Sequence, residues 1–262
     1  MNQQSETLER QMTFLDHLAE LRRRILISLV AVAAGFAGSY FFSKEIFRWL
    51  RMPYDKVYEK VFHVTPDLIN TNLLEGFMVY LKIGFIGGIF LASPVLFLQV
   101  WKFIAPALHP HERRHVIPFV LLATLFFVGG ALFGYFLVFP PSFEWFLTLT
   151  KGEHIQATIR MEEYYKFAAW MLMGFGVAFE APLLVLYLVY FRIIQPKQLI
   201  QFWRGIIVGI FVVSAVITPT PDIGTMTMMA LPLIVLYGLT IIISLFMAWR
   251  TKGEKSVTNR QE

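Results

Sequence analysis

Two glutamates stand beside arginines in short charged segments of an otherwise apolar sequence. Glu20 lies in TFLDHLAELRRR (Thr13–Arg24), and Glu112 lies in QVWKFIAPALHPHERRHVIP (Gln99–Pro118). A carboxylate accepts two parallel charge-assisted hydrogen bonds from a guanidinium, so both residues are suited to binding a cation. Each glutamate taken alone is more often a solvated surface residue, and Glu20 with Arg24 four positions later can simply form an exposed ion pair on a helix.

The sequence contains no pattern typical of an enzyme. It has no HExxH, GxSxG or Walker motif, and it has no cysteine. Three histidines are close together, but they stand beside prolines and arginines without a matching set of carboxylates: His109, His111 and His115. We therefore expect no enzyme activity, no cofactor and no metal site.

The composition is that of an integral membrane protein. Of the 262 residues, 56% are hydrophobic and only 16% are charged, and the mean hydropathy is +0.59. A helix needs about 20 mostly apolar residues to cross a bilayer. The sequence predicts an all-α polytopic membrane protein with six transmembrane helices, at Ile25–Phe42, Gly76–Val100, Val116–Phe139, Phe167–Phe191, Gly205–Ile217 and Ile223–Trp249.

The fifth predicted span, Gly205–Ile217, is unusually short. A helix of this length reaches about 20 Å, against a hydrocarbon core of about 30 Å. The sixth span follows after TPTPD, a turn that cannot extend either helix. Either the fifth helix begins earlier, at Phe202-Trp203, or the bilayer is thinner beside this hairpin.

Six spans place both ends of the chain on one side of the membrane. Lys and Arg number fourteen on that side and seven on the other, which favours cytoplasmic termini. Residues 1–24 are then a cytoplasmic segment with a short amphipathic helix, residues 25–249 form the membrane domain, and residues 250–262 form a polar tail expected to be disordered. The loop at about 99–118 faces the same compartment as the first segment. Together the two predict a receptor for a positively charged peptide.

A few polar residues fall inside or beside the predicted spans. Glu180 lies deep in the fourth span, where a charge is costly. It predicts either an interhelical hydrogen bond, with the carboxyl protonated, or a functional polar position that faces a groove. Lys82 and Lys166 are expected to extend their amines to the outer interface. Asp222 is expected to cap the sixth helix, and Pro53 to shape a turn in the first outer loop.

Four strings of the sequence resemble the TatC family, the core subunit of the twin-arginine protein translocase. They are FLDHLAELRRR, QVWKFIAPALHPHERR, FEAP in the fourth span and TPTPD before the sixth. The resemblance extends from about Thr13 to Trp249. It implies a curved six-helix scaffold, N-in/C-in, with short helices 5 and 6. It further implies a bacterial or archaeal cytoplasmic-membrane protein that receives signal peptides with consecutive arginines and exports folded proteins using the proton-motive force.

The resemblance also implies which residues bind the signal peptide. In the family, the glutamates that match Glu20 and Glu112 bind the arginine pair, and the recognition loop includes the positions of Phe103, Leu108 and Arg113. This agrees with the chemistry of guanidinium, whose planar fork lysine cannot copy. Two consecutive arginines therefore favour two carboxylates held apart.

Other family positions lie in the membrane and on the outer side. The glutamate that matches Glu180 is linked, with the hairpin of spans 5 and 6, to recruiting the single-span partners TatA and TatB into a multimeric complex. Pro53 and Asp222 match outer-loop positions linked to translocation. Many members have glutamine where this chain has Met226, so a polar docking contact there depends on the hydroxyl of Thr227 or of Thr225.

A second hypothesis is a proton- or cation-coupled transporter of a small solute that uses Glu180. The sequence shows neither a clear internal repeat nor a partner for a charge inside the membrane, and both absences weigh against this alternative. The net charge of +5 reflects loops on one side of a membrane, so we expect contact with membrane lipid and not with nucleic acid.

Overall fold

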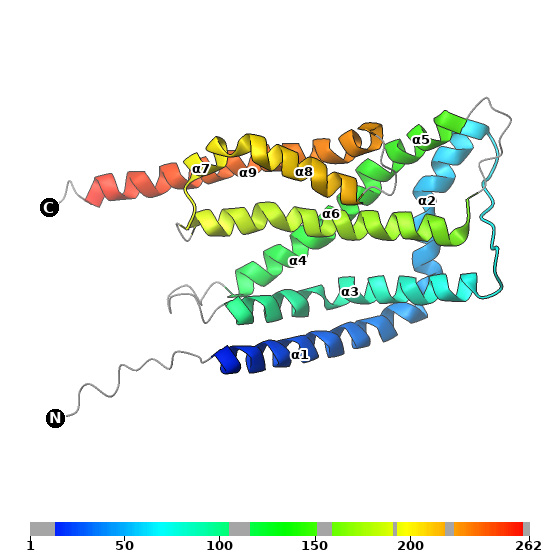
Figure 1. Ribbon diagram of the computed structural model, residues 1–262, viewed down its shortest axis with the longest axis horizontal. Coiled ribbons are helices and arrows are strands. Elements are labelled where there is room, and N and C mark those ends of the chain that lie inside the picture. The colour runs from blue at the N-terminus through cyan, green and yellow to red at the C-terminus, as the bar shows by residue number, and fades with distance from the viewer. Residues whose placement is uncertain (1–13, 105–115, 151–158, 191–192, 218–222, 259–262) are drawn as a thin grey trace. The chain divides into compact units, whose positions relative to one another are not determined.

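The computed structural model describes residues 14–104, 116–150, 159–190, 193–217 and 223–258. Over these residues the elements are helices, labelled in Figure 1, apart from one isolated bridge between Ile69 and Arg160. The contacts divide the chain into two compact units. One unit contains residues 1–42 and 84–124, and the other contains residues 43–83 and 125–262.

Helices α1 (Phe14–Phe41) and α3 (Glu75–Ile104) are in contact in the first unit, where their backbones meet at glycines. A Cβ atom on Gly35 would lie 2.5 Å from the carbonyl oxygen of Gly88, and a Cβ atom on Gly88 would lie 2.5 Å from the backbone nitrogen of Phe36. Only glycine permits so close an approach, which is common where membrane helices pack. The two helices run antiparallel, so the start of α1 lies beside the end of α3 (Figure 1).

Helix α2 (Ser43–Phe62) has one apolar stripe and packs in the second unit against α5 (Phe139–Thr150). Its buried residues recur every three or four positions, as expected of a helix with one face toward a core. The core is aromatic: the Tyr54 ring lies 5.4 Å from the rings of both Phe143 and Tyr164, measured between centroids. Stacked and tilted rings of this kind supply much of the buried apolar surface.

Helix α4 (Val116–Phe133) continues without a break into α5 through a π turn, Gly134–Val138. The π turn comes directly before Pro140 and Pro141. Proline has no N–H to donate to the carbonyl four residues earlier, so a wider turn relieves the helix at this point. The membrane-crossing stretch is consequently longer than predicted, Val116–Leu149.

The remaining helices belong to the second unit: α6 (Met161–Tyr190), the short α7 (Pro196–Gln201), α8 (Trp203–Ile217) and α9 (Ile223–Thr258). Within the described ranges, five stretches are long and apolar enough to cross a membrane, and α8 is a shorter apolar helix. These are the six transmembrane helices that the sequence predicts. Helix α8 begins at Trp203, as the earlier-start alternative requires, yet its 15 residues still reach only about 22 Å.

Several local expectations differ from the structure. Thr13–Arg24 is not a separate surface helix, because α1 runs unbroken from Phe14 into the first span. Pro53 does not shape a turn and lies inside α2. The sixth helix is not short: α9 has 36 residues and continues to Thr258, through most of the stretch expected as a disordered tail.

Candidate functional site

A half-buried ion pair lies where the start of α1 meets the end of α3. The Nη2 atom of Arg24 lies 2.7 Å from Oε1 of Glu20, and the two side chains are 22% and 16% exposed. The predicted pair is therefore present, but it is not the exposed pair of the sequence interpretation. Arg24 also donates from Nη1 to Oε1 of Gln99, a buried residue of α3, over 3.5 Å. Two helices thus hold one carboxylate at the end of the first unit.

An aromatic contact lies one helical turn before Glu20. His17 of α1 stacks on Phe103 of α3, with ring centroids 4.6 Å apart and an angle of 28° between the rings. His17 is exposed and Phe103 is half-buried. The other predicted signal-peptide residues, Leu108, Glu112 and Arg113, lie outside the described residues.

Chemically, this end of the first unit offers an anion beside apolar surface. The Glu20 carboxylate has one charged partner among the described residues, and Phe103 provides an aromatic ring on the neighbouring helix. A peptide with both a guanidinium and apolar side chains matches these two features. Charge-assisted hydrogen bonds at a partly desolvated carboxylate contribute about 1.5–3 kcal/mol each.

Glu180 lies within α6, and its Oε1 atom is buried without a hydrogen-bond partner among the residues that the structure describes. The expected interhelical hydrogen bond to this atom is therefore not present in that part of the chain. Most buried polar atoms in proteins are hydrogen-bonded, so an unsatisfied carboxylate oxygen at membrane depth is an exception that requires an explanation.

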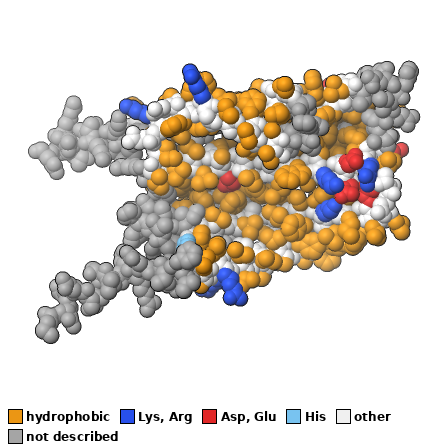
Figure 2. Space-filling view, viewed as in Figure 1, with side chains coloured by type: hydrophobic (Ala, Val, Ile, Leu, Met, Phe, Trp, Pro, Cys, Tyr) orange, Lys and Arg blue, Asp and Glu red, His pale blue; other side chains and the backbone are white. Residues whose placement is uncertain are grey.

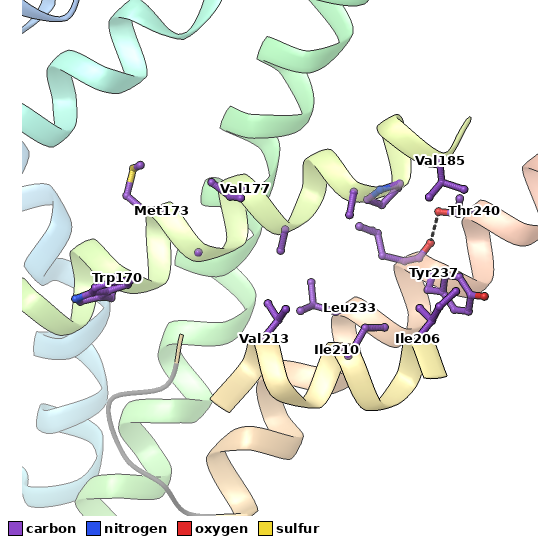
Figure 3. Close-up of a pocket in the computed structure, with 16 residues that line it drawn as sticks. Trp170, Met173, Val177, Val185, Ile206, Ile210, Val213, Leu233, Tyr237 and Thr240 are labelled. Carbon is purple, nitrogen blue, oxygen red and sulfur yellow. Dashed lines mark hydrogen bonds between the residues drawn. The ribbon is translucent and has the colours of Figure 1, made fainter. Parts of the chain in front are cut away.

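A large apolar pocket lies between α6, α8 and α9. Residues on either side of Glu180 in the sequence line it, but Glu180 itself does not. Its volume is about 790 Å³. Figure 3 shows Val177 of α6, Ile210 and Val213 of α8 and Leu233 of α9 around it. Apolar side chains at membrane depth suit a lipid chain or the hydrocarbon face of another helix.

The structure does not bring the predicted docking residues together in this pocket. Neither Glu180 nor Met226 nor Thr227 is part of its lining. Met226 is half-buried, while Thr227 is exposed and donates its hydroxyl to the carbonyl of Ile223 over 2.7 Å. Asp222 and the side chain of Thr225 lie outside the described residues.

Two lysines meet one glutamate near the N-terminal ends of α3 and α6. The Nζ atoms of Lys82 and Lys166 lie 2.9 Å and 3.2 Å from Oε1 of Glu162. This explains how a lysine is tolerated inside a span: its long side chain reaches a carboxylate near the interface. Figure 2 shows one group of acidic and basic side chains at the right of the view, next to extensive hydrophobic surface.

Glu75, at the start of α3, is the most buried carboxylate of this region, with a side chain only 2% exposed. It accepts hydrogen bonds from the backbone and hydroxyl of Thr71, from the backbone of Asn72 and from the backbone of Glu162, and it pairs with Arg160 at 3.4 Å. One side chain therefore binds the loop before α3 to the start of α6. Five donors surround a single acceptor, which suits an ionised carboxylate.

Pro53 is accommodated inside α2 by a hydrogen bond from a distant helix. A proline at this position leaves the carbonyl of Trp49, four residues earlier, without its helical partner. The hydroxyl of Tyr135 donates to that carbonyl over 2.6 Å, and its ring stacks on the Trp49 ring at 3.9 Å. Tyr164 donates in the same way to the carbonyl of Leu50 over 2.5 Å.

A partly exposed ion pair lies on the same helix. Arg51 donates to Asp55 over 2.6 Å and to the carbonyl of Pro66 over 2.5 Å. Burial raises the pKa of Asp55, and the Arg51 guanidinium opposes part of that rise. The pair joins α2 to the loop that follows it.

Sequence reasoning missed Gln99, Glu75 and the contacts of His17 and Tyr135. No local sequence pattern predicts these contacts, because each joins residues more than 50 positions apart or involves a residue in a loop. One signal was available: Gly84 and Gly88 form the small-xxx-small spacing that marks close contact between membrane helices. No three His, Asp or Glu residues of the described ranges gather where they could hold a metal ion.

Comparison with known proteins identifies the family. The model of the family described as "Sec-independent protein translocase protein (TatC)" matches residues 16–232. The Sec-independent protein translocase protein TatC of Koribacter versatilis is 40% identical over 232 residues, which are 88% of this chain and 84% of that protein. The protein of the same name from Escherichia coli is 34% identical over 232 residues, 88% of each chain.

A solved structure agrees with the sequence comparisons. The "Crystal Structure of Twin Arginine Translocase Receptor- TatC" superposes with a TM-score of 0.76 at 36% identity, covering 88% of this chain and 98% of that one. The family model covers more than half of the chain, and the relatives align over most of their length. This chain belongs to the TatC family and is a multi-pass membrane protein.

Proposed function

We propose that this TatC-family protein is the signal-peptide receptor and core subunit of a twin-arginine translocase. It receives folded cargo through the signal peptide and supports its export across the cytoplasmic membrane of a bacterium, driven by the proton-motive force. The observation that carries the proposal is the half-buried Glu20 carboxylate, which pairs with Arg24 of α1, whose guanidinium in turn contacts Gln99 of α3. The family membership favours this function over the solute-transporter alternative.

The first arginine of the signal peptide binds Glu20 in this proposal. A guanidinium can form two parallel hydrogen bonds to the carboxylate, whereas a lysine ammonium acts as a single point of charge. Phe103 contacts apolar residues next to the arginine pair. Glu112 binds the second arginine, and Leu108 and Arg113 complete the recognition loop.

The orientation follows from the charge distribution. Both termini and the loop at about 99–118 are cytoplasmic, because the loops on that side contain fourteen of the Lys and Arg residues and the outer loops seven. The signal peptide therefore meets Glu20 before the cargo crosses. Measuring the accessibility of a cysteine placed at position 2 and of one placed at position 64 tests this directly, since the chain has no native cysteine. Labelling of position 2 from the outside would contradict the orientation.

The apolar pocket of α6, α8 and α9 is proposed to receive the membrane helix of a single-span TatA or TatB subunit. Glu180, Met226 and Thr227 lie outside its lining and are proposed as further docking positions. A cysteine at Val213, inside the pocket, should then crosslink to such a subunit more strongly than one at Val30, which is 69% exposed on α1. Equal crosslinking at both positions would remove the pocket from the proposal.

The receptor role is tested by peptide binding. The chain in lipid nanodiscs is titrated with a fluorescent signal peptide that carries Arg-Arg, and with a Lys-Lys peptide of the same length. Glu20→Gln should lower the affinity for the Arg-Arg peptide by about tenfold or more, since one to two charge-assisted hydrogen bonds are lost. Glu59→Gln, an exposed acidic position on α2, is the matched control.

Two results would contradict the receptor role. The first is equal binding of both peptides to the parent chain. The second is unchanged Arg-Arg binding in Glu20→Gln. A cell-based check is export of a folded reporter in a strain that lacks its own TatC but retains the partner subunits.

A further inference from the structure

The carboxylate proposed to bind a signal arginine already binds an arginine of its own chain. Arg24 stands four residues after Glu20, on the same face of α1, and its Nη2 lies 2.7 Å from the Glu20 carboxylate. Each side chain is less than a quarter exposed. A guanidinium that binds both oxygens of this carboxylate therefore competes with Arg24 for Oε1.

Arg24 is held in a way that permits displacement. Its Nη1 reaches Gln99 only at 3.5 Å, the outer limit of a hydrogen bond, and its Nε atom is buried without a partner among the described residues. A guanidinium has five N–H donors, so this one is poorly satisfied. The neighbouring Arg22 and Arg23 are exposed and form no ion pair within the described ranges.

We infer that Arg24 is an internal substitute for the signal-peptide arginine: it occupies Glu20 in the unbound receptor and leaves when a signal guanidinium binds. The inference rests on the proposed receptor function and adds a specificity-determining residue to it. The exchange replaces one guanidinium–carboxylate pair by another, so its cost to an arginine peptide is small. A lysine must break the same pair without forming an equivalent fork, and Arg24 therefore discriminates against lysine.

The inference predicts that removing Arg24 strengthens binding. A half-buried helix ion pair contributes up to about 1 kcal/mol, so Arg24→Gln should raise the affinity for the Arg-Arg peptide by up to about fivefold. The Lys-Lys peptide should gain more, which lowers the preference for arginine. Arg22→Gln is the matched control, because it removes the same charge from the same helix without freeing Glu20.

A conservative variant and a double variant keep the test decisive. Arg24→Lys retains the positive charge and should give a smaller gain than Arg24→Gln, and a thermal melt of each variant verifies folding. Adding Glu20→Gln to Arg24→Gln should abolish the gain, since the freed carboxylate is its source.

The possible outcomes separate the inference from the function it rests on. If the parent prefers the Arg-Arg peptide and Arg24→Gln exceeds Arg22→Gln in affinity, the inference holds. If Arg24→Gln binds no better than Arg22→Gln, or binds worse, Arg24 only positions Glu20 and the inference is overturned while the receptor function stands. If the parent does not distinguish the two peptides, both fail.

Discussion

The glycine contact between α1 and α3 is the feature that most directly positions Glu20, and Gly88→Ala tests it. The added Cβ would lie 2.5 Å from the backbone nitrogen of Phe36, 2.8 Å from its Cα and 3.0 Å from the carbonyl carbon of Gly35. All three are backbone atoms, so no side chain can rotate away. Ordinary contact begins at 3.4 Å, and the helices must therefore separate by about 0.9 Å at this point.

The separation should affect stability and binding together. Overpacking of this kind costs about 1–3 kcal/mol. Residue 99 lies about 16 Å further along α3, and the contact from Arg24 to Gln99, already 3.5 Å long, should be lost. We expect a lower melting temperature in nanodiscs. Binding of the Arg-Arg peptide should also weaken, because Phe103 on α3 moves away from Glu20 on α1, even though loss of the Gln99 contact releases Arg24.

Gly129→Ala is the matched control, because a Cβ atom added to Gly129 would meet no neighbouring atom within 4 Å. It should leave binding unchanged and keep or slightly raise the melting temperature, since alanine favours helix over glycine. The reasoning is refuted if Gly88→Ala melts and binds as the parent does.

Three further predictions concern the second unit. Tyr135→Phe should lower the stability of the parent by about 1–2 kcal/mol in a thermal melt. In a Pro53→Ala background the loss should be much smaller, because the N–H of Ala at position 53 can donate to the Trp49 carbonyl; additive effects of the two substitutions would contradict this. Glu75→Gln should lower stability by about 1.5–3 kcal/mol and make the loop before α3 more sensitive to proteolysis. If this loop resists proteolysis as well as in the parent, Glu75 does not anchor it. Glu180→Leu should raise the melting temperature, since a buried unsatisfied oxygen is removed, and should lower export of the folded reporter. A lower melting temperature would show that Glu180 has a structural partner.

Hydropathy and residue spacing within one helix were enough to predict the features that depend on local sequence alone. The six spans follow from the length of each apolar run, and the pair between Glu20 and Arg24 follows from their separation by four residues. The outward reach of Lys82 follows from its long side chain near the end of a span. These features need no knowledge of which helices are neighbours.

Contacts between distant segments could not be predicted in this way. Pro53 was expected in a turn because proline disfavours a helix interior, but the hydroxyl of Tyr135, 82 positions later, satisfies the freed carbonyl and lets α2 continue. The burial of the pair between Glu20 and Arg24 depends likewise on α3. The glycine spacing in α3 predicts a close contact, yet Gly35 can be identified as its partner only from the fold.

The carboxylates of the second unit differ from Glu20 in how many partners each has within the chain. At the N-terminal ends of α3 and α6, Glu162 has two lysine partners and Glu75 has five donors, so these two carboxylates are satisfied within the chain. Glu20 has one charged partner in the described ranges. Oε1 of Glu180 and Nε of Arg24 are buried there without a partner, and so is Nε of Arg160 beside Glu75, so an unpaired atom alone does not mark a functional position. Leaving such an atom unpaired costs about 1–3 kcal/mol. In the two proposals, a signal guanidinium displaces Arg24 from Glu20 and frees its side chain for solvent, and a group of another subunit reaches Glu180 in the membrane.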